Sequence, residues 1–552
     1  MDPYEKSKIF TKRYKKLKTL LKIIFGYESF RPKQYEIINK IICGEDVCAI
    51  LPTGYGKSAC YQIPALYLDK PAIIISPLIS LMDDQKLILN DLGISSCCYN
   101  SNVENKFQMK KDILQCKYKF IYTTPESVLN MKEFLQNLDE KQGISLIAID
   151  EAHCISSYGF DFRKSYRELT FLKEILPNVP ILAVTATATT NVGEDICKVL
   201  NFKHNKPIKT SFDRPNLYLE IRQKGKNIGN DIVPIIKEYE NKSIIIYCLT
   251  KKETEKVAEI LGMHKIKCGI YHAGLNPEIK TKTHHNFIKG KIKIIAATIA
   301  FGMGINKSDV RVIIHYGSPK NIEGYYQEIG RAGRDGKKAY CYTFYNFGDF
   351  KIQERFIKNT PDSFYQKNQL KLLDQIKRYM TTKQCRRQIL LEYFDEDTND
   401  KCNFCDNCCS VHKKMNIENI EIEQNVEKEA KMLINLIESI TIKNKSFGIG
   451  MYINILRGSN NKNITSIMRK SKYYGAGKHR SIAWWKEMSD KLIDQGFLQQ
   501  FYLKKGRFVM QLIITTTGGK KWANPQDLND LLDGGQNDSK LILKPMKMIT
   551  NI

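Results

Sequence analysis

The stretch "AILPTGYGKSACYQIPA", residues 49 to 65, places a glycine-rich turn between an apolar run and a helical segment. Backbone N–H groups at the start of such a helix can surround phosphate oxygens. We expect Lys57 to contact the β- and γ-phosphates of a nucleotide, and the Ser58 hydroxyl to help bind Mg²⁺. The strict phosphate-loop pattern has glycine at position 51, where this chain has Leu51. The other loop residues expected to line the site are Thr53, Gly54 and Gly56.

A second stretch, "SLIAIDEAH" at residues 145 to 153, supplies carboxylates after an apolar run. A strand there would deliver Asp150 and Glu151 to its C-terminal end. We expect Asp150 to bind Mg²⁺ and Glu151 to polarise the attacking water. The alternative interpretation is an acidic cap on the following helix. The two stretches together predict ATP binding and hydrolysis more strongly than either does alone.

Five cysteines crowd into the pattern C-x₁₆-C-x₂-C-x₂-C-C at Cys385, Cys402, Cys405, Cys408 and Cys409. Four thiolates with short spacings can form a closed tetrahedral shell around Zn²⁺, which would give the ion a structural role. A C-x₂-C-x₂-C run also suits an iron–sulfur cluster. The spacing therefore predicts a metal centre and leaves the choice of four ligands open.

The elements that must position these groups follow from the apolar pattern. From residue 45 to about 205, helical stretches alternate with the runs "VCAIL", "AIIIS", "FIYT", "SLIAID" and "ILAVTAT". Between about 212 and 350 the pattern repeats with "SIIIYC", "KCGIYH", "IKIIAAT", "VRVIIHY" and "AYCYTFY". Continuous apolar runs are typical of buried parallel strands. The sequence thus predicts an α/β protein with two doubly wound parallel-sheet lobes, joined near "FDRPN", with ligand sites at the C-terminal strand ends.

Composition limits the partners and the cellular setting. The 86 Lys and Arg residues against 59 Asp and Glu residues give a net charge of +27, which indicates a polyanion partner such as nucleic acid. A lysine-rich codon bias would raise the charge as well. No apolar run approaches the roughly 20 residues that span a bilayer, and the start of the chain has no signal-peptide pattern. We expect an intracellular protein without a membrane partner, either nuclear or cytoplasmic, with protein partners unknown.

Residues 25 to about 515 resemble a RecQ-type DNA helicase of helicase superfamily two, with the motifs in the family order. The stretch "FGYESFRPKQYEII" resembles the adenine-recognition segment of that family. The resemblance implies that Tyr27 and Arg31 sandwich the adenine ring and that the Gln34 amide reads its edge. Stacking of a guanidinium on an aromatic face and a paired amide donor and acceptor suit this task. The family also tolerates a residue other than glycine at position 51.

The second-lobe stretches "ATIAFGMGINKSDVRVIIHY" and "YYQEIGRAGRDG" resemble motifs that face the nucleotide. The resemblance implies that Gln327 contacts the nucleotide and that Arg331 and Arg334 are supplied across the cleft. A guanidinium there can stabilise charge on the transferring phosphoryl group, and Arg334 is the preferred candidate. The alternative interpretation is two surface arginines in a glycine-bounded turn. The stretch "AVTATAT" resembles the motif that couples hydrolysis to lobe movement.

The resemblance also selects a zinc set and a DNA-binding module. It implies that the zinc ligands are Cys385, Cys402, Cys405 and Cys408, with Cys409 as the spare. The segment that contains "KSKYYGAGKHR" resembles a winged-helix domain, in which Tyr474 and Lys478 are expected to contact DNA. The predicted wing tip, residues 504 to 507, is short and basic, so no strand-separating aromatic residue is assigned.

The resemblance divides the chain into RecA-like lobes and accessory parts. The expected division is a basic N-terminal extension over 1–24, lobe 1 over 25–210, lobe 2 over 211–350, a helical zinc-binding subdomain over 351–411, a linker over 412–425, a winged-helix domain over 426–522 and a flexible tail over 523–552.

The stretch "HCISSYGFDFRKSYREL" after the paired carboxylates resembles the family's aromatic-rich loop, which senses single-stranded DNA. Stacking on bases tolerates any sequence, which suits a translocating enzyme. The family usually has Trp at the position of Tyr158 and His at that of Phe160. Tyrosine retains a smaller stacking face, so we expect weaker coupling. The residues expected to bind DNA or couple it to hydrolysis are His153, Tyr158, Phe160, Phe162 and Arg163.

The resemblance implies an ATP- and Mg²⁺-dependent DNA helicase with one structural Zn²⁺. It would move 3′ to 5′ on single-stranded DNA and unwind duplex or branched DNA in replication, recombination or repair. One alternative is an RNA-dependent DEAH-type helicase, against which the aromatic stretch, the zinc spacing and the winged helix argue. Another is a non-catalytic DNA-binding module with a dead ATPase core, against which the intact Lys57, Asp150, Glu151 and Arg334 argue.

Overall fold

The computed structural model forms two compact units, residues Met1–Ser410 and Val411–Ile552, each of which is described by itself. The residues that the structure describes are 3–159, 161–204, 206–301, 307–360, 363–398, 401–409, 427–441, 446–461, 463–505 and 508–523. The expected linker over 412–425 lies outside these ranges, as do residues 302–306 of the second-lobe motif and 524–552 of the expected tail.

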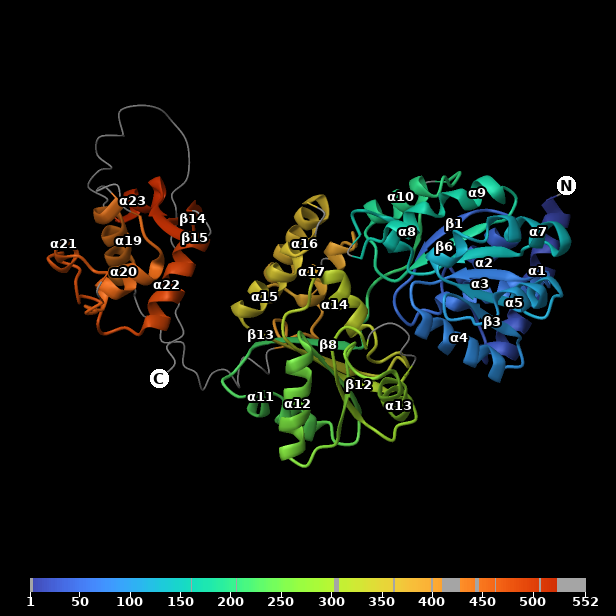
Figure 1. The fold of residues 1–552 in the computed structure, drawn as a ribbon, viewed down its shortest axis with the longest axis horizontal. Helices are drawn as coiled ribbons and strands as arrows, with labels where there is room; N and C mark the ends of the chain where they lie inside the picture. The colour runs from blue at the N-terminus through green and yellow to red at the C-terminus, as the bar shows by residue number, and fades with distance from the viewer. Residues whose placement is uncertain are drawn as a thin grey trace. The chain divides into compact units, whose positions relative to one another are not determined.

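Lobe 1 is built on a seven-stranded parallel sheet with helices on both faces (Figure 1). Most of its strands are buried on both faces, which explains their continuous apolar sequences. In spatial order the strands are β3 (Ser96–Tyr99), β4 (Phe120–Thr123), β2 (Ala72–Ile75), β5 (Leu146–Ile149), β6 (Ile181–Thr185), β1 (Val47–Ile50) and β7 (Ile208–Lys209). The five runs expected from the sequence are β1, β2, β4, β5 and β6, whereas β3 and β7 were not predicted.

The helices of lobe 1 include an N-terminal helix that packs on the lobe. Leu17 and Leu21 of this helix, α1 (Pro3–Phe25), are buried in one cluster with Ile38 and Ile63. The basic start of the chain is therefore anchored to lobe 1. The remaining helical segments are α2 (Gln34–Ile42), α3 (Lys57–Leu68), α4 (Ile79–Asp91), α5 (Lys106–Leu114), α6 (Pro125–Val128), α7 (Lys132–Gln142), η1 (Ala152–Ile155), α8 (Lys164–Arg167), η2 (Glu168–Thr170), α9 (Phe171–Ile175) and α10 (Thr190–Val199).

Lobe 2 has a six-stranded parallel sheet, of which β8 was not predicted as a strand. In spatial order the strands are β10 (Cys268–Tyr271), β11 (Ile294–Ala297), β9 (Ser243–Cys248), β12 (Val310–Tyr316), β13 (Ala339–Tyr345) and β8 (Leu217–Gln223). Its helices are α11 (Ile228–Glu238), α12 (Lys251–Met263), α13 (Pro277–Ile288), α14 (Ile322–Ile329) and α15 (Phe347–Lys358). Two doubly wound lobes confirm the predicted fold class.

The cysteine-rich segment attaches to the free edge of the lobe 2 sheet. Cys385 lies between α16 (Ser363–Thr381) and α17 (Arg386–Tyr393), and the other cysteines follow α17. Cys405 forms an isolated parallel bridge with Leu219 of β8, and the Asp406 N–H donates to the Leu219 carbonyl at 2.9 Å. The Ile221 N–H donates to the Asp406 carboxylate at 3.0 Å. The cysteine loop thus continues the hydrogen bonding of edge strand β8.

The second unit is a small helical domain with an antiparallel hairpin, as expected for a winged helix. Its core includes the fully buried Trp485 and Tyr452, with Leu433 and Ile513. Its elements are α19 (Glu427–Thr441), α20 (Ile449–Leu456), α21 (Ser466–Arg469), α22 (Ile482–Asp494), β14 (Leu498–Lys505), β15 (Phe508–Thr515) and α23 (Thr517–Ala523). Within the described ranges of both units, no helix is long and apolar enough to cross a membrane.

Candidate nucleotide site and zinc centre

The glycine-rich turn connects β1 to the start of α3, and Lys57 is the first residue of that helix. Gly56 caps the helix with φ at 87°, a conformation that favours glycine. A Cβ at Gly56 would lie 2.6 Å from Gln34 Nε2, so a side chain also has no room. The loop therefore presents backbone N–H groups at a helix N-terminus, as phosphate binding requires. Ser58 lies in the first turn of the same helix.

Asp150 and Glu151 follow β5 near Lys57, and Glu151 is buried whereas Asp150 is half-buried. Burial and then the Glu151 charge raise the pKa of Asp150 to about 6, and burial raises the pKa of Glu151. Burial also lowers the pKa of Lys57, although the two carboxylates oppose that shift. A divalent cation would favour the ionised carboxylates, and oxygen ligands from Asp150 and Ser58 suit Mg²⁺. The residues present fit the predicted Mg²⁺ site.

His153 connects these carboxylates to the end of β6. Its Nδ1 lies 2.9 Å from Thr185 Oγ1 and 3.4 Å from the Glu151 carboxylate. Burial lowers the pKa of His153 to about 4, so the ring is neutral near pH 7. The Thr187 N–H in turn donates to Thr185 Oγ1 at 3.3 Å. The acidic motif and the "AVTATAT" motif thus form one hydrogen-bonded unit.

Lobe 2 contacts this unit through α14 and the turn that follows it. Gln327 Nε2 donates to Glu151 Oε1 at 3.3 Å, although 176 residues separate the two in sequence. Gly330 packs against the phosphate loop so closely that an added Cβ would lie 3.0 Å from Thr53 Cβ. Glu151 of lobe 1 therefore lies at the boundary with lobe 2.

Both predicted finger arginines reach the same boundary. Arg331 is 3% exposed, and the Arg334 side chain lies against Gly54, where a Cβ would be 3.1 Å from Arg334 Cγ. Burial, with repulsion from Arg331 and Arg214, lowers the pKa of Arg334 to about 9. Among the described residues, Arg331 Nε and Thr53 Oγ1 are buried without a hydrogen-bond partner. Buried cations and unpaired donors of this kind fit a polyphosphate anion.

Arg214, in the connection between the lobes, was missed as a site residue. Its Nη2 donates to the Ala332 and Gly333 carbonyls at 2.9 and 3.0 Å, and its Nη1 lies 3.4 Å from the Thr53 carbonyl. One guanidinium thus joins the phosphate loop to the arginine-bearing turn. A single arginine in "FDRPN" has no spacing pattern that could have revealed these distant partners.

The predicted adenine segment packs on the outer side of the phosphate loop. The Arg31 guanidinium lies 5.5 Å from the centre of the Tyr55 ring and donates to the Gly54 carbonyl. Gln34 Oε1 accepts from the Arg31 N–H at 2.8 Å, and its Nε2 donates to the Tyr55 carbonyl at 3.0 Å. Tyr27 is 58% exposed, and the described residues show no stacking of Tyr27 on Arg31. The adenine roles of these residues stay predictions.

The aromatic-rich loop passes directly behind the acidic motif. A Cβ at Gly159 would lie 2.4 Å from the His153 carbonyl oxygen, so only glycine allows this approach. Arg163 Nη1 donates to the Pro77 carbonyl at 3.3 Å, and Tyr158 is 57% exposed. Phe162 is half-buried, whereas Phe160 lies outside the described residues. The loop that carries the exposed Tyr158 ring therefore contacts the acidic motif.

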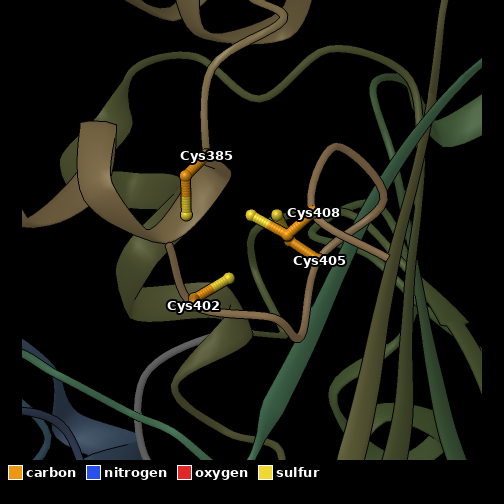
Figure 2. A group of neighbouring side chains, drawn as sticks. All are labelled: Cys385, Cys402, Cys405 and Cys408. Atoms are coloured by element: carbon orange, nitrogen blue, oxygen red, sulfur yellow. The ribbon is translucent and has the colours of Figure 1, made fainter. Parts of the chain in front are cut away.

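The four predicted zinc ligands converge at the start of α17 and in the loop that follows it. Their Sγ atoms all lie within 4.8 Å of one another, and Figure 2 shows the thiols pointing toward a common centre. The Cys409 Sγ lies outside this group, 3.4 Å from the Asn403 carbonyl. Four converging thiols fit a tetrahedral Zn²⁺ site and leave Cys409 as the spare. The four are Cys385, Cys402, Cys405 and Cys408.

The predicted DNA contacts of the second unit lie at one crossing of two loops. Tyr474 Oη donates to the Ser459 carbonyl at 3.0 Å, and the exposed Lys478 passes beside Gly458 and Gly475. Tyr474 thus supports the loop from which Lys478 projects. Residues 506 and 507 of the predicted wing tip, and the side chains around them, lie outside the described residues.

Family models match four consecutive segments of the chain. A DEAD/DEAH box helicase model matches residues 31–195, and a helicase conserved C-terminal domain matches residues 228–336. A RecQ zinc-binding model matches residues 347–409, and an RQC domain matches residues 421–518. The ATP-dependent DNA helicase RecQ of Haemophilus influenzae is 37% identical over 87% of this chain and 76% of its own length. The chain belongs to the RecQ family of helicases. As the resemblance implied, it is an ATP-dependent helicase with a RecQ zinc-binding region.

Other relatives of this RecQ-type helicase carry different names. A protein of Acanthamoeba polyphaga mimivirus described as a putative ATP-dependent RNA helicase is 67% identical over the full length of both chains. The bifunctional 3′-5′ exonuclease/ATP-dependent helicase WRN of Mus musculus is 39% identical over 91% of this chain, which spans 36% of that protein. The solved structure of S. cerevisiae Dbp5 bound to RNA and ADP BeF3 is 18% identical, with a TM-score of 0.50, over 65% of this chain and 96% of that one. That likeness shows the fold alone.

Proposed function

We propose that this RecQ-family enzyme is a DNA helicase that moves 3′ to 5′ on single-stranded DNA and separates duplex or branched DNA. The observation that carries the proposal is the hydrogen bond from Gln327 in lobe 2 to Glu151 in lobe 1. Glu151, the proposed hydrolytic carboxylate, lies at the lobe boundary. A change in the contact between the lobes would therefore also change the surroundings of the reacting phosphate. Repeated closure and opening would move the lobes along a strand.

The roles proposed for the site residues follow from their positions. Lys57 and the loop N–H groups would bind the β- and γ-phosphates, while Asp150 and Ser58 would hold Mg²⁺. Mg²⁺ held there would neutralise negative charge that develops on the phosphates. Glu151 would orient the attacking water and accept its proton. Arg331 and Arg334 would stabilise charge on the transferring phosphoryl group from the opposite lobe.

The DNA substrate is supported by features that ATP hydrolysis does not need. Tyr158 exposes a stacking face, and the loop that bears it contacts His153 beside the catalytic carboxylates. The net charge of +27 favours binding along a phosphate backbone. The winged-helix unit would add a duplex contact around Tyr474 and Lys478. We also propose the domain limits inferred from the sequence, with lobe boundaries near residues 210 and 350.

The deciding experiment measures ATP hydrolysis with no nucleic acid, with single-stranded DNA and with single-stranded RNA, beside strand separation on 3′-tailed, 5′-tailed and forked duplexes. We expect stimulation by DNA and unwinding that needs a 3′ tail. Stimulation by RNA alone would refute the DNA assignment and support the activity named for the mimivirus relative. Lys57→Ala should abolish hydrolysis and leave DNA binding largely intact, whereas equal loss of both would indicate misfolding.

A further inference from the structure

Residues 393 to 396, which begin at the last residue of α17 in the zinc-binding region, contact the connection between the two lobes. We call these residues the latch. The Phe394 ring stacks on Phe212 with a centroid distance of 4.1 Å and an interplanar angle of 3°. The Glu396 carboxylate accepts from the Phe212 N–H at 2.6 Å and from Ser211 Oγ at 2.8 Å. Phe212 lies in the connection itself, between the end of β7 and the start of β8.

The latch also contacts lobe 1 at the end of the "AVTATAT" motif. The Asp395 carboxylate accepts from the N–H of Thr190, the first residue of α10, at 2.7 Å. Lys209 Nζ donates to the Phe394 carbonyl at 3.1 Å and to Thr190 Oγ1 at 2.8 Å. Thr190 is five residues beyond Thr185, which hydrogen-bonds His153 beside Glu151. The latch therefore contacts the start of α10, directly after the motif that hydrogen-bonds His153.

The third set of latch contacts is made with lobe 2. Tyr326 of α14 donates to the Phe212 carbonyl at 2.6 Å, and its ring centre lies 5.0 Å from that of Phe394. Tyr393 Oη donates to the Glu323 carboxylate on the same helix. Because α14 also carries Gln327, the helix that contacts Glu151 is held by the latch as well.

The latch is connected to the cysteine centre through α17. Cys385 caps the N-terminus of this eight-residue helix, and the latch begins at its last residue. A helix of this length spans about 12 Å, so a change in the position of Cys385 reorients a short, stiff rod. Arg386, the first residue of the helix, forms two hydrogen bonds to the Asp406 carboxylate in the cysteine loop, at 2.9 and 3.0 Å. The direction of α17 is thus fixed at the cysteine end.

We propose that Phe394, Asp395 and Glu396 are positioning residues for ATP hydrolysis, and that the zinc centre acts on the lobe boundary through α17. The latch holds the connection, the start of α10 and α14 in the register that places Gln327 at Glu151. The inference rests on the proposed function only in taking ATP hydrolysis as the reaction that the latch affects. Its structural part can be tested without DNA.

The first test compares Glu396→Ala and Phe394→Ala with the conservative Glu396→Gln. We expect kcat for ATP to fall about tenfold or more in both alanine variants, with KM for ATP changed less than twofold, because Glu396→Ala removes two hydrogen bonds to a charged group and Phe394→Ala removes the ring stacked on Phe212. Glu396→Gln retains an acceptor oxygen and should recover part of the rate. Asp397→Ala is the matched control, because Asp397 is exposed and has no hydrogen bond or ion pair to a described residue. Equal kcat in Glu396→Ala and Asp397→Ala would overturn the proposal.

The second test reads the structure directly by amide hydrogen exchange. The Thr190 and Phe212 N–H groups donate to latch carboxylates, so they should exchange faster when the latch is displaced. Gln388→Gly softens the middle of α17 by about 1 kcal/mol without touching a cysteine, and Gln388→Ala is its control. We expect faster exchange at both amides in the glycine variant, with zinc content unchanged.

The third test removes the metal with a chelator and follows the same two amides, using β1 amides as a reference for global unfolding. Faster exchange at Thr190 and Phe212 with β1 protected would support the zinc link. Unchanged exchange at both amides after zinc loss would refute it. Exchange needs neither DNA nor turnover, so a protein that failed to unwind DNA would still give a clear result here.

Discussion

Replacing Arg334 by methionine separates the cost of burying its charge from its use in catalysis. The side chain packs against Gly54 of the phosphate loop, and methionine retains much of that apolar stem. Burial, with repulsion from Arg331 and Arg214, lowers the pKa of Arg334 from 12.5 to about 9. At 1.36 kcal/mol for each pKa unit, keeping this guanidinium charged costs about 5 kcal/mol. A bound polyphosphate would offset that cost.

The Arg334→Met variant should therefore show two opposite effects. Without nucleotide, its melting temperature should equal or exceed that of the unaltered protein, because a desolvated charge has been removed. With ATP, kcat should fall by about 10³-fold, which corresponds to about 4 kcal/mol of lost transition-state stabilisation. The stabilisation on adding a non-hydrolysable ATP analogue should also shrink, since the buried cation no longer pairs with phosphate.

The assay combines steady-state ATP hydrolysis, with and without single-stranded DNA, and thermal melting with and without the analogue. Arg378→Met is the control, because Arg378 has an 81% exposed side chain and a surface ion pair with Asp374. That change should alter stability by less than about 1 kcal/mol and leave kcat unchanged. If Arg334→Met were clearly less stable without nucleotide, or kept kcat within about fivefold of the original, the reasoning would be wrong.

Three further predictions concern Mg²⁺, zinc and DNA. Burial and Glu151 raise the pKa of Asp150 to about 6, so the rate of ATP hydrolysis should decline as the pH falls through 6. A higher Mg²⁺ concentration should shift this decline to lower pH. A decline that did not respond to Mg²⁺ would contradict the assignment of Asp150 as a Mg²⁺ ligand. Cys405→Ser should abolish zinc binding in elemental analysis, whereas Cys409→Ser should keep one zinc per chain. Tyr158→Ala should weaken single-stranded DNA binding in a titration by roughly 1–3 kcal/mol, whereas Tyr158→Trp should not weaken it. If DNA stimulated ATP hydrolysis equally in Tyr158→Ala and the unaltered protein, the loop would serve only in packing.

Most strands could be predicted because their apolar runs are a local signal, and the exceptions have local reasons. Strand β3 reads "SCCY" and lacks Val and Ile, while β7 is only two residues long at the sheet edge. Strand β8, "LYLEIRQ", carries Glu220 and Arg222, which pair at 2.6 Å. The cysteine loop pairs with this edge at Leu219 and Cys405. A sheet edge whose partner lies nearly 190 residues away gives no local pattern.

Some residues of the candidate site could likewise be predicted from local motifs, and others could not. Lys57, Asp150 and the four cysteines belong to short motifs whose spacing reveals their chemistry. Arg214 has its partners 116 to 161 residues away, and only the fold brings them together. The latch is a similar case, because Phe394 and Glu396 look like an ordinary helix end until Phe212 is placed beside them.

Glu151 is contacted by lobe 2 and by His153, which connects it to the end of β6 and to the aromatic-rich loop. Its backbone takes the left-handed conformation at φ 51°, which turns the chain sharply after β5. One carboxylate oxygen accepts from Gln327 of lobe 2, and the other faces His153, which bonds the end of β6. The aromatic-rich loop contacts the same His153 through its backbone at Gly159. A shift of the loop, of β6 or of α14 therefore alters the environment of one buried carboxylate. If the loop binds DNA and Glu151 acts in hydrolysis as proposed, DNA and the opposite lobe would both act on the same group.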